Sequence, residues 1–176
     1  AEHVVWRWGN LKGKVLAFCL AYLFLNRLRQ PLLFAAATEE LRKLQPSVIF
    51  SLQHTGHLFN VTNQATILFD NILFNQGGGY SARHGEFTVP VSGLYHVSYR
   101  GWSYRQQAGF LHLLVNDISI SESPVGDTAY ESASSQSLVQ HLQQGDILSI
   151  YVATSGTIRM MGEDRTTFMG YLIQAD

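Results

Sequence analysis

Residues 69–99 read FDNILFNQGGGYSARHGEFTVPVSGLYHVSY, and this stretch decides the fold. Its anchors are separated by five, four, six and five residues and are Phe69, Asn75, Tyr80, Phe87 and Gly93. Beyond Gly93, the side chains of Tyr95, Val97 and Tyr99 alternate with polar ones. Such alternation is typical of a β-strand with one buried face. We therefore expect these three residues to point into the core of a β-sheet protein.

The remainder of the chain after Pro46 has the same character. Blocks rich in β-branched and aromatic residues are separated by turns containing glycine, asparagine or proline. The predicted strands are 48–53, 65–69, 85–88, 93–102, 110–116, 136–142, 147–153 and 167–173. Many short strands with this spacing favour an all-β sandwich or jelly roll.

The spacing of the anchors resembles the diagnostic pattern of the complement C1q globular-head domain family. Val97 stands where that family has an aromatic residue, and the other anchors match. The segments LQQGDI at 142–147 and FMGYLI at 168–173 resemble the family's last turn and its closing strand. The resemblance covers residues 47–174. It implies a ten-stranded jelly roll, shared with tumour-necrosis-factor-like ligands, that assembles as a homotrimer.

The chain divides into an N-terminal extension at 1–46 that is not β-structure and a C1q-like domain at 47–176. The apolar run 15–25 follows two lysines and precedes Ala35-Ala36-Ala37, which is the arrangement of a secretory signal peptide. An amphipathic helix is the alternative for this segment. The run is too short to cross a bilayer, so no membrane span is expected. The sequence has no Gly-X-Y repeat and therefore resembles the head-only members of the family.

The distribution of charge excludes some function classes. Residues 1–45 hold seven basic and three acidic side chains, whereas residues 46–176 hold five arginines, no lysine and ten acidic side chains. An acidic domain does not favour nucleic-acid binding, which needs clustered basic residues. His54 and His57 lack a metalloprotease glutamate, Gly77–Gly79 is not followed by a phosphate-loop lysine, and no nucleophile elbow occurs. The chain is therefore not expected to be an enzyme.

Carbohydrate binding is the first candidate activity, because sugars are recognised by aromatic faces and fixed polar groups. The polar and aromatic residues at the end of a predicted strand, together with arginines of a predicted charged loop at 159–165, give the candidate ligand-binding residues. These are Trp102, Tyr104, Arg105, Gln106, Arg159 and Arg165. Packing in the trimer interface is the alternative for Trp102 and Tyr104. Asn60-Val61-Thr62 is an N-glycosylation acceptor site if the chain is secreted.

Calcium is a possible cofactor, because the resemblance implies a calcium site near the apex of some C1q-like trimers and hard cations need several oxygen ligands. The candidate ligands lie in two acidic stretches and are Asp127, Glu131, Glu163 and Asp164. A solvated loop is the alternative for both stretches. Tyr80 is followed by serine where many family members have aspartate, and this departure weakens the expectation.

The function that the resemblance implies is that of a secreted, extracellular pattern-recognition lectin of innate immunity. A homotrimer of heads would bind microbial glycans by avidity, since linked sites raise the effective affinity for a repeating surface. Two alternatives remain open at this stage. The trimer could be a signalling ligand that binds a receptor, or a structural trimer of the extracellular matrix.

Overall fold

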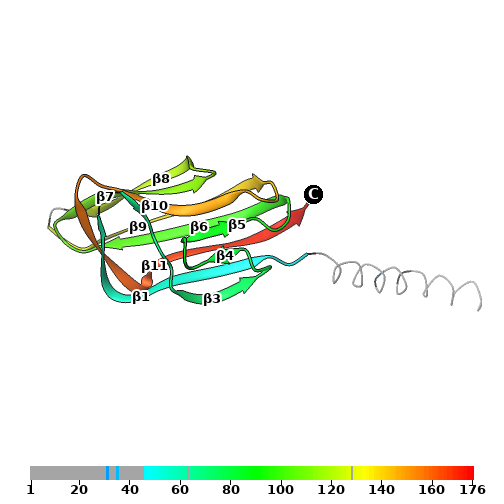
Figure 1. Ribbon diagram of the computed structural model, residues 1–176, viewed down its shortest axis with the longest axis horizontal. Helices are drawn as coiled ribbons and strands as arrows, with labels where there is room; N and C mark the ends of the chain where they lie inside the picture. Colours follow the sequence, from blue (N-terminus) through cyan, green and yellow to red (C-terminus); the bar gives the residue numbers. More distant parts are fainter. Residues whose placement is uncertain (1–30, 32–34, 36–45, 63, 128) are drawn as a thin grey trace, which may run out of the picture. The chain divides into compact units, whose positions relative to one another are not determined.

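The computed structural model describes residues 31, 35, 46–62, 64–127 and 129–176 (Figure 1). Residues 46–176 form one compact unit built of β-strands. The expectation of an all-β jelly-roll sandwich is confirmed for this unit. The predicted signal-type run at 15–25 lies outside the described residues.

One layer of the sandwich is an antiparallel sheet of five strands. In spatial order these strands are β3 (Asn71–Gln76), β1 (Ile49–Thr62), β11 (Thr157–Ala175), β6 (Gly93–Ser103) and β9 (Ser132–Leu142). The first and last of the described strands therefore lie next to each other in this sheet. Figure 1 shows β1 and β11 side by side along most of their length.

The second layer is an antiparallel sheet in which β10 has a central place. In spatial order its strands are β4 (Tyr80–Ser81), β5 (Glu86–Thr88), β10 (Ile147–Ala153), β7 (Gln107–Val115) and β8 (Ile118–Asp127). The two-residue strand β2 (Ala65–Thr66) pairs with β10 outside this order. The described residues thus hold eleven strands, one more than the resemblance implies.

The core lies between the two sheets and is rich in aromatic side chains. Phe50 stacks on Phe87 with ring centroids 4.1 Å apart and meets the edge of Phe168 at 4.8 Å. Tyr95 and Tyr99 are fully buried, as the alternation in β6 predicts. Val97 is also buried, so the one position that departs from the family pattern keeps its place in the core.

Tyr80 links the start of the diagnostic stretch to the core. Its hydroxyl donates to the carbonyl oxygen of Phe69 and accepts from the amide of Phe69, both at 3.0 Å. Burial raises the pKa of Tyr80 to about 12, although the bond to the Phe69 backbone acts in the opposite direction. Phe87 pairs with Tyr80 across the β4–β5 ladder. Three of the spaced anchors therefore form one contact network.

The strands differ from the sequence prediction in several places. Strand β1 continues to Thr62, nine residues beyond the predicted end at 53. Strands β3, β4 and β8 were not predicted, because their sequences are short or rich in serine, asparagine and glycine. Strand 65–69 is reduced to the two residues of β2. Strand β11 begins ten residues earlier than predicted and includes the charged segment 159–165, which was expected to be a loop. Two long neighbours, β1 and β6, extend the sheet and hold this segment in β11.

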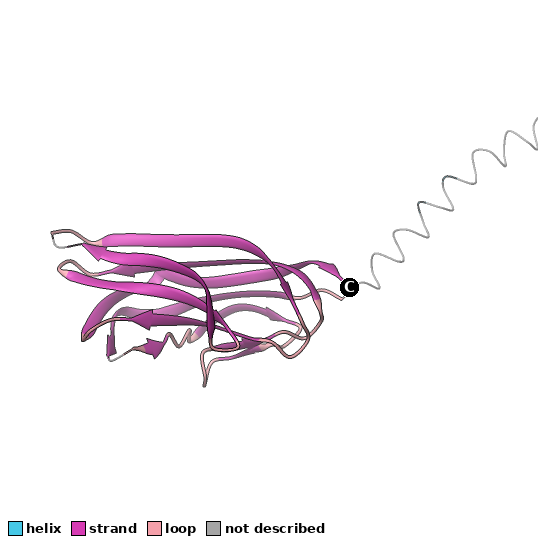
Figure 2. Cartoon of the chain, turned by 90° about the horizontal axis from the view of Figure 1, so that it is seen from above, coloured by secondary structure: helices cyan, strands magenta, loops and turns pink. Residues whose placement is uncertain are grey.

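Four connections between strands lie at the end of the sandwich opposite the C-terminus. Figure 2 shows the strands running lengthwise between this end and the C-terminus. We call it the far end. The connections at the far end are β1–β2, β6–β7, β8–β9 and β10–β11.

Candidate ligand-binding surface

The five-stranded sheet turns one face away from the core, and the strand register places residues on that outer face in rows. Near the C-terminus one row runs from Ile49 through Tyr171 and His96 to Val139. Toward the far end, Arg100 pairs with Thr167 and Trp102 pairs with Met161. The outer face therefore has two halves of different chemistry.

The half near the C-terminus is apolar and exposed. Val139 is 55% exposed and Phe74 is 62% exposed. The large apolar side chains that this half turns to solvent are Ile49, Phe74, Leu94, Val139, Met169 and Tyr171. His96 stacks on Tyr171 at 5.0 Å in the middle of them. A contiguous apolar patch of this kind marks an interaction surface on a soluble domain.

The half toward the far end carries arginines stacked on two aromatic rings, and we call these six residues the arginine–aromatic patch. The guanidinium carbons of Arg100 and Arg165 lie 5.1 Å and 5.8 Å from the ring centroid of Trp102. Those of Arg105 and Arg159 lie 5.4 Å and 5.9 Å from the ring centroid of Tyr104. Both rings follow the outward alternation of β6 into the β6–β7 turn. The patch comprises Arg100, Trp102, Tyr104, Arg105, Arg159 and Arg165.

Backbone hydrogen bonds fix the β6–β7 turn against β11. The amide of Tyr104 donates to the carbonyl oxygen of Arg159 at 2.8 Å. The amide of Arg159 donates to Oε1 of Gln107 at 3.1 Å. Gln106 occupies the turn with a φ of 60°, and its side chain is exposed. The turn residues and the β11 arginine thus form one surface.

The charged segment of β11 lies at an irregularity shared by two strands. Register shifts occur in β1 between Gln53 and Leu58 and in β11 between Met161 and Thr167. Gly162 is required here, because a Cβ at this position would overlap the carbonyl oxygen of Gly56. Glu163 adopts a φ of 58° beside it. The prediction of a charged loop at 159–165 is therefore wrong, because this segment is an irregular part of β11.

The carboxylate of Glu163 is already engaged by basic groups. Its Oε2 accepts from the guanidinium of Arg165 at 3.0 Å, and its Oε1 lies 3.2 Å from Nδ1 of His57. These contacts do not suit a calcium ligand, since a nearby cationic group competes with the metal for the same oxygens. The neighbouring Asp164 is exposed.

The other candidate calcium ligands belong to the β8–β9 connection. Asp127 ends β8, and its side chain lies outside the described atoms; Glu131 is exposed just before β9. Among the described residues, no three histidine, cysteine or acidic side chains come close enough to hold a metal ion. Calcium binding through Asp127 and Glu131 stays a prediction.

The predicted glycosylation site borders the arginine–aromatic patch. Asn60 is exposed in β1 and is the direct cross-strand neighbour of Arg159. In this part of the chain β1 pairs with β11 but no longer with β3. The Asn60 side chain is therefore open to solvent at a sheet edge, beside the patch.

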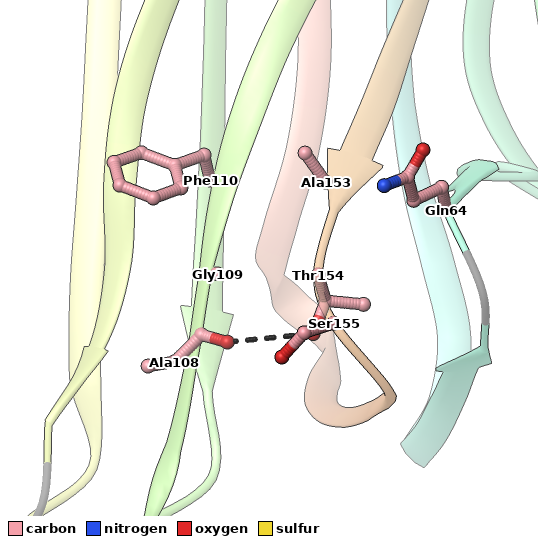
Figure 3. Close-up of a pocket in the computed structure, with 7 residues that line it drawn as sticks. All are labelled: Gln64, Ala108, Gly109, Phe110, Ala153, Thr154 and Ser155. Atoms are coloured by element: carbon pink, nitrogen blue, oxygen red, sulfur yellow. Dashed lines mark hydrogen bonds between the residues drawn. The ribbon is translucent and has the colours of Figure 1, made fainter.

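A second, uncharged candidate lies on the other sheet, also at the far end (Figure 3). It is an open pocket of about 440 Å³. Phe110 forms one wall, and the hydroxyl of Thr154 donates to the carbonyl oxygen of Ala108 at 3.5 Å across its lower part. Its lining residues are Gln64, Ala108, Gly109, Phe110, Ala153, Thr154 and Ser155. The lining contains no charged group and one exposed aromatic ring.

Sequence reasoning selected five of the six residues in the arginine–aromatic patch and missed Arg100. The structure brings the selected residues together, although 54 positions separate Arg105 from Arg159. The signal for Arg100 was its position two residues before Trp102 in an alternating strand, which places both side chains on one face. Gln106 lies in the turn of the patch without a contact to its rings among the described interactions.

Comparisons with known proteins agree with this architecture. The family model described as the C1q domain matches residues 49–173. The chain is 29% identical over 114 residues to "Complement C1q and tumor necrosis factor-related protein 9" of Mus musculus, covering 62% of this chain and 33% of that protein. It is 24% identical over 131 residues to "Complement C1q tumor necrosis factor-related protein 6" of Rattus norvegicus, covering 72% of this chain and 50% of that protein. The chain thus spans at most half the length of these relatives.

Solved structures show the same fold. The "Globular Domain of Zebrafish Complement 1qA protein" has a TM-score of 0.59 and 20% identity, covering 73% of this chain and 99% of that one. The "Structure of Eiger TNF from S. frugiperda" has a TM-score of 0.62 and 14% identity, covering 75% of this chain and 96% of that one. Within the described residues, the structure contains no helix with the length and apolar character needed to cross a membrane.

Proposed function

The chain belongs to the C1q domain family, and from that premise we propose that it is a secreted, extracellular lectin of innate immunity. In this proposal a homotrimer of C1q-like heads binds microbial glycans through the arginine–aromatic patch. The observation that carries the proposal is the arrangement of two aromatic rings and four arginines at the far end of the domain. The role is one of binding, not of catalysis.

The apolar half of the outer face supports assembly from copies of this chain. It is continuous with the row Ile49, Tyr171, His96 and Val139, which crosses four strands of the sheet. Burying apolar surface contributes roughly 25 cal/mol per Å² removed from water. A ring of three copies closes through heterologous contacts, in which two different surfaces of each copy meet, and the apolar half would belong to these contacts. The far end, with its turns, then remains available to ligand.

The patch supports sugar binding by its chemistry. Aromatic faces offer apolar area to the C–H groups of a sugar ring, and fixed polar groups orient its hydroxyls. The Tyr104–Arg159 backbone bond at 2.8 Å holds the turn in place before ligand arrives, which lowers the ordering cost of binding. Three linked patches on one trimer raise the effective affinity for a repeating glycan surface.

A receptor-binding signalling ligand is the second candidate function. Trp, Tyr and Arg are also the side chains that most often dominate protein–protein interfaces, so the same patch suits a receptor. The relatives described as tumour-necrosis-factor-related keep this candidate open. A structural matrix trimer is the third, and the described surface offers nothing that favours it.

A binding screen on immobilised microbial polysaccharides and glycans tests the proposal. The trimer should be retained by at least one glycan class, and Tyr104→Ala should reduce retention. Phe110→Ala is the matched control, because this exposed ring belongs to the uncharged pocket on the other sheet. If Phe110→Ala loses binding and Tyr104→Ala keeps it, the pocket is the site. If no glycan is retained, the lectin proposal fails and the receptor ligand takes its place.

A further inference from the structure

The domain concentrates its positive charge in one place. Residues 46–176 contain five arginines and no lysine, and four of these arginines belong to the arginine–aromatic patch. The fifth, Arg83, lies in the β4–β5 turn of the other sheet. The net acidity of the domain therefore hides a local cluster of arginines toward the far end, where Glu131, Glu163 and Asp164 also lie. Net charge does not describe what a ligand meets at this site.

Among the described side chains, few acidic groups neutralise this positive charge. Arg165 is paired with Glu163 at 3.0 Å. Among the described side chains, no carboxylate lies within ion-pair distance of Arg100, Arg105 or Arg159. Their guanidinium carbons lie over aromatic rings instead. A cation–π contact does not use up the five N–H donors of a guanidinium, which can still bond an acceptor.

The patch is rich in hydrogen-bond donors and poor in acceptors. A guanidinium carries five N–H donors and no acceptor. Nε1 of Trp102 has no acceptor among the described residues, but it is buried and therefore adds no donor for a ligand. Neutral sugar hydroxyls can also accept from these groups, but they carry no negative charge that would strengthen the bond to a guanidinium. Carboxylate and sulfate groups accept several hydrogen bonds and match a guanidinium in a two-pronged geometry.

We propose that the arginine–aromatic patch selects anionic saccharides, whose carboxylate or sulfate groups bind the arginines held over Trp102 and Tyr104. This inference rests on the lectin function proposed above and names its ligand class. A polymer with a charge on each sugar repeat can engage more than one guanidinium of a subunit. It can also engage the patches of several subunits in the trimer.

The test compares polysaccharides that differ in charge and share a backbone. Polygalacturonate is compared with its fully methyl-esterified form, and dextran sulfate with dextran, by titration of the intact chain. The anionic member of at least one pair should bind about tenfold more tightly than its neutral partner, which corresponds to about 1.4 kcal/mol. The first pair reports carboxylate recognition and the second reports sulfate recognition. Raising the salt concentration should weaken binding, because exposed charges are screened.

Substitutions of single arginines and of arginine pairs identify which positive charges bind the anionic polymer. The double variant R105Q/R159Q should lose about tenfold in affinity for the anionic polymer, equivalent to about 1.4 kcal/mol. Arg83→Gln removes one positive charge elsewhere and should leave affinity unchanged. Melting temperature and light scattering of each variant show that fold and assembly are intact. An equal loss in Arg83→Gln means that net charge decides binding, and this result overturns the proposal.

The outcomes separate this inference from the lectin function. Equal or better binding of the neutral polymers overturns the anionic ligand class and leaves the lectin function standing. Binding of none of the four polymers, and of no glycan in the wider screen, overturns both. Single-stranded DNA is included as a competitor, since arginines with aromatic rings also suit nucleic acid. Tighter binding of DNA than of any saccharide overturns the proposal in favour of a nucleic-acid ligand.

Discussion

The side-chain amide of Asn75 bonds both backbone polar groups of Tyr80. Its Nδ2 donates to the carbonyl oxygen of Tyr80 at 3.2 Å, and its Oδ1 accepts from the amide of Tyr80 at 3.0 Å. Asn75 thereby closes the turn of three glycines between β3 and β4 and positions the Tyr80 ring in the core. This pair gives the spacing of asparagine and tyrosine in the diagnostic stretch a physical role.

Asn75→Ala should destabilise the domain by about 1–3 kcal/mol, because it leaves two backbone groups of a buried residue without partners. Chemical denaturation at fixed protein concentration measures the change. Gln76→Ala is the matched control, since Gln76 is exposed one position further along β3. Equal losses in both variants would mean that the Asn75–Tyr80 bonds do not stabilise the turn.

Alkaline pH should weaken the domain through Tyr80. Its pKa is raised from 10.0 to about 12 by burial, so the neutral phenol is favoured in the folded state. The stabilisation is fully present below pH 10 and is lost as the pH rises through 12, at about 2–3 kcal/mol. The free energy of unfolding should therefore fall less between pH 9 and pH 12 in Tyr80→Phe than in the parent chain. The same fall in both would remove Tyr80 as the cause.

Trimer assembly should depend on the apolar half of the outer face. Val139→Asp places a charge in the proposed contact between copies, where burial of an unpaired charge is strongly unfavourable. Light scattering should give about three times 19.7 kDa for the parent chain and a smaller mass for the variant. Ile118→Asp is the control, because Ile118 is 69% exposed on the other sheet. A parent chain that is monomeric at micromolar concentration would contradict the assembly.

Glycosylation of Asn60 should reduce ligand binding. The cross-strand position of Asn60 places a glycan at this residue directly beside Arg159. Mass spectrometry of the chain from a secretory expression host should find the modified asparagine. Enzymatic deglycosylation should then raise affinity for the anionic polymer. Unchanged affinity after complete removal of the glycan would show that the sheet edge at Asn60 takes no part in ligand binding.

Calcium is expected to act, where it binds, through Asp127 and Glu131 and not through Glu163. Glu163 is held by Arg165 and His57, so its substitution should not change a calcium response. A chelator should lower the melting temperature of the parent chain if the ion binds the folded state. Asp127→Asn should abolish part of that shift. A chelator that leaves the melting temperature unchanged removes calcium from the account.

The fold could be predicted from the sequence because its anchors carry strong local signals. The alternation in 93–99 identified the buried face of β6, and Tyr95 and Tyr99 lie in the core as expected. Strand β8 carries a short alternation in ISIS at 118–121, but the polar SES and the proline that follow obscured it; an edge strand tolerates such a proline. The charged residues in 159–165 predicted a loop. The structure instead places the segment in β11, at register shifts in its pairing with β1 and β6.

The candidate site could be predicted only in part. Trp102, Tyr104 and Arg105 are close in sequence and were selected together. The contact of the Tyr104 ring with Arg159 depends on the β6–β11 register, which one sequence does not reveal. The concentration of arginines at one end was likewise hidden, since composition reports the acidity of the whole domain and not the position of each charge.

Nuclear magnetic resonance of the arginine side chains tests whether the arginine–aromatic patch binds an anionic saccharide. The Nε–H signals of the five domain arginines are followed while a galacturonic acid trisaccharide is added to the intact trimer. We expect the chemical shifts of Arg100, Arg105, Arg159 and Arg165 to change with one common affinity. The chemical shift of Arg83 should not change. Shifts of Arg83 equal to those of the other four, or no shifts at saturating trisaccharide, would contradict this expectation.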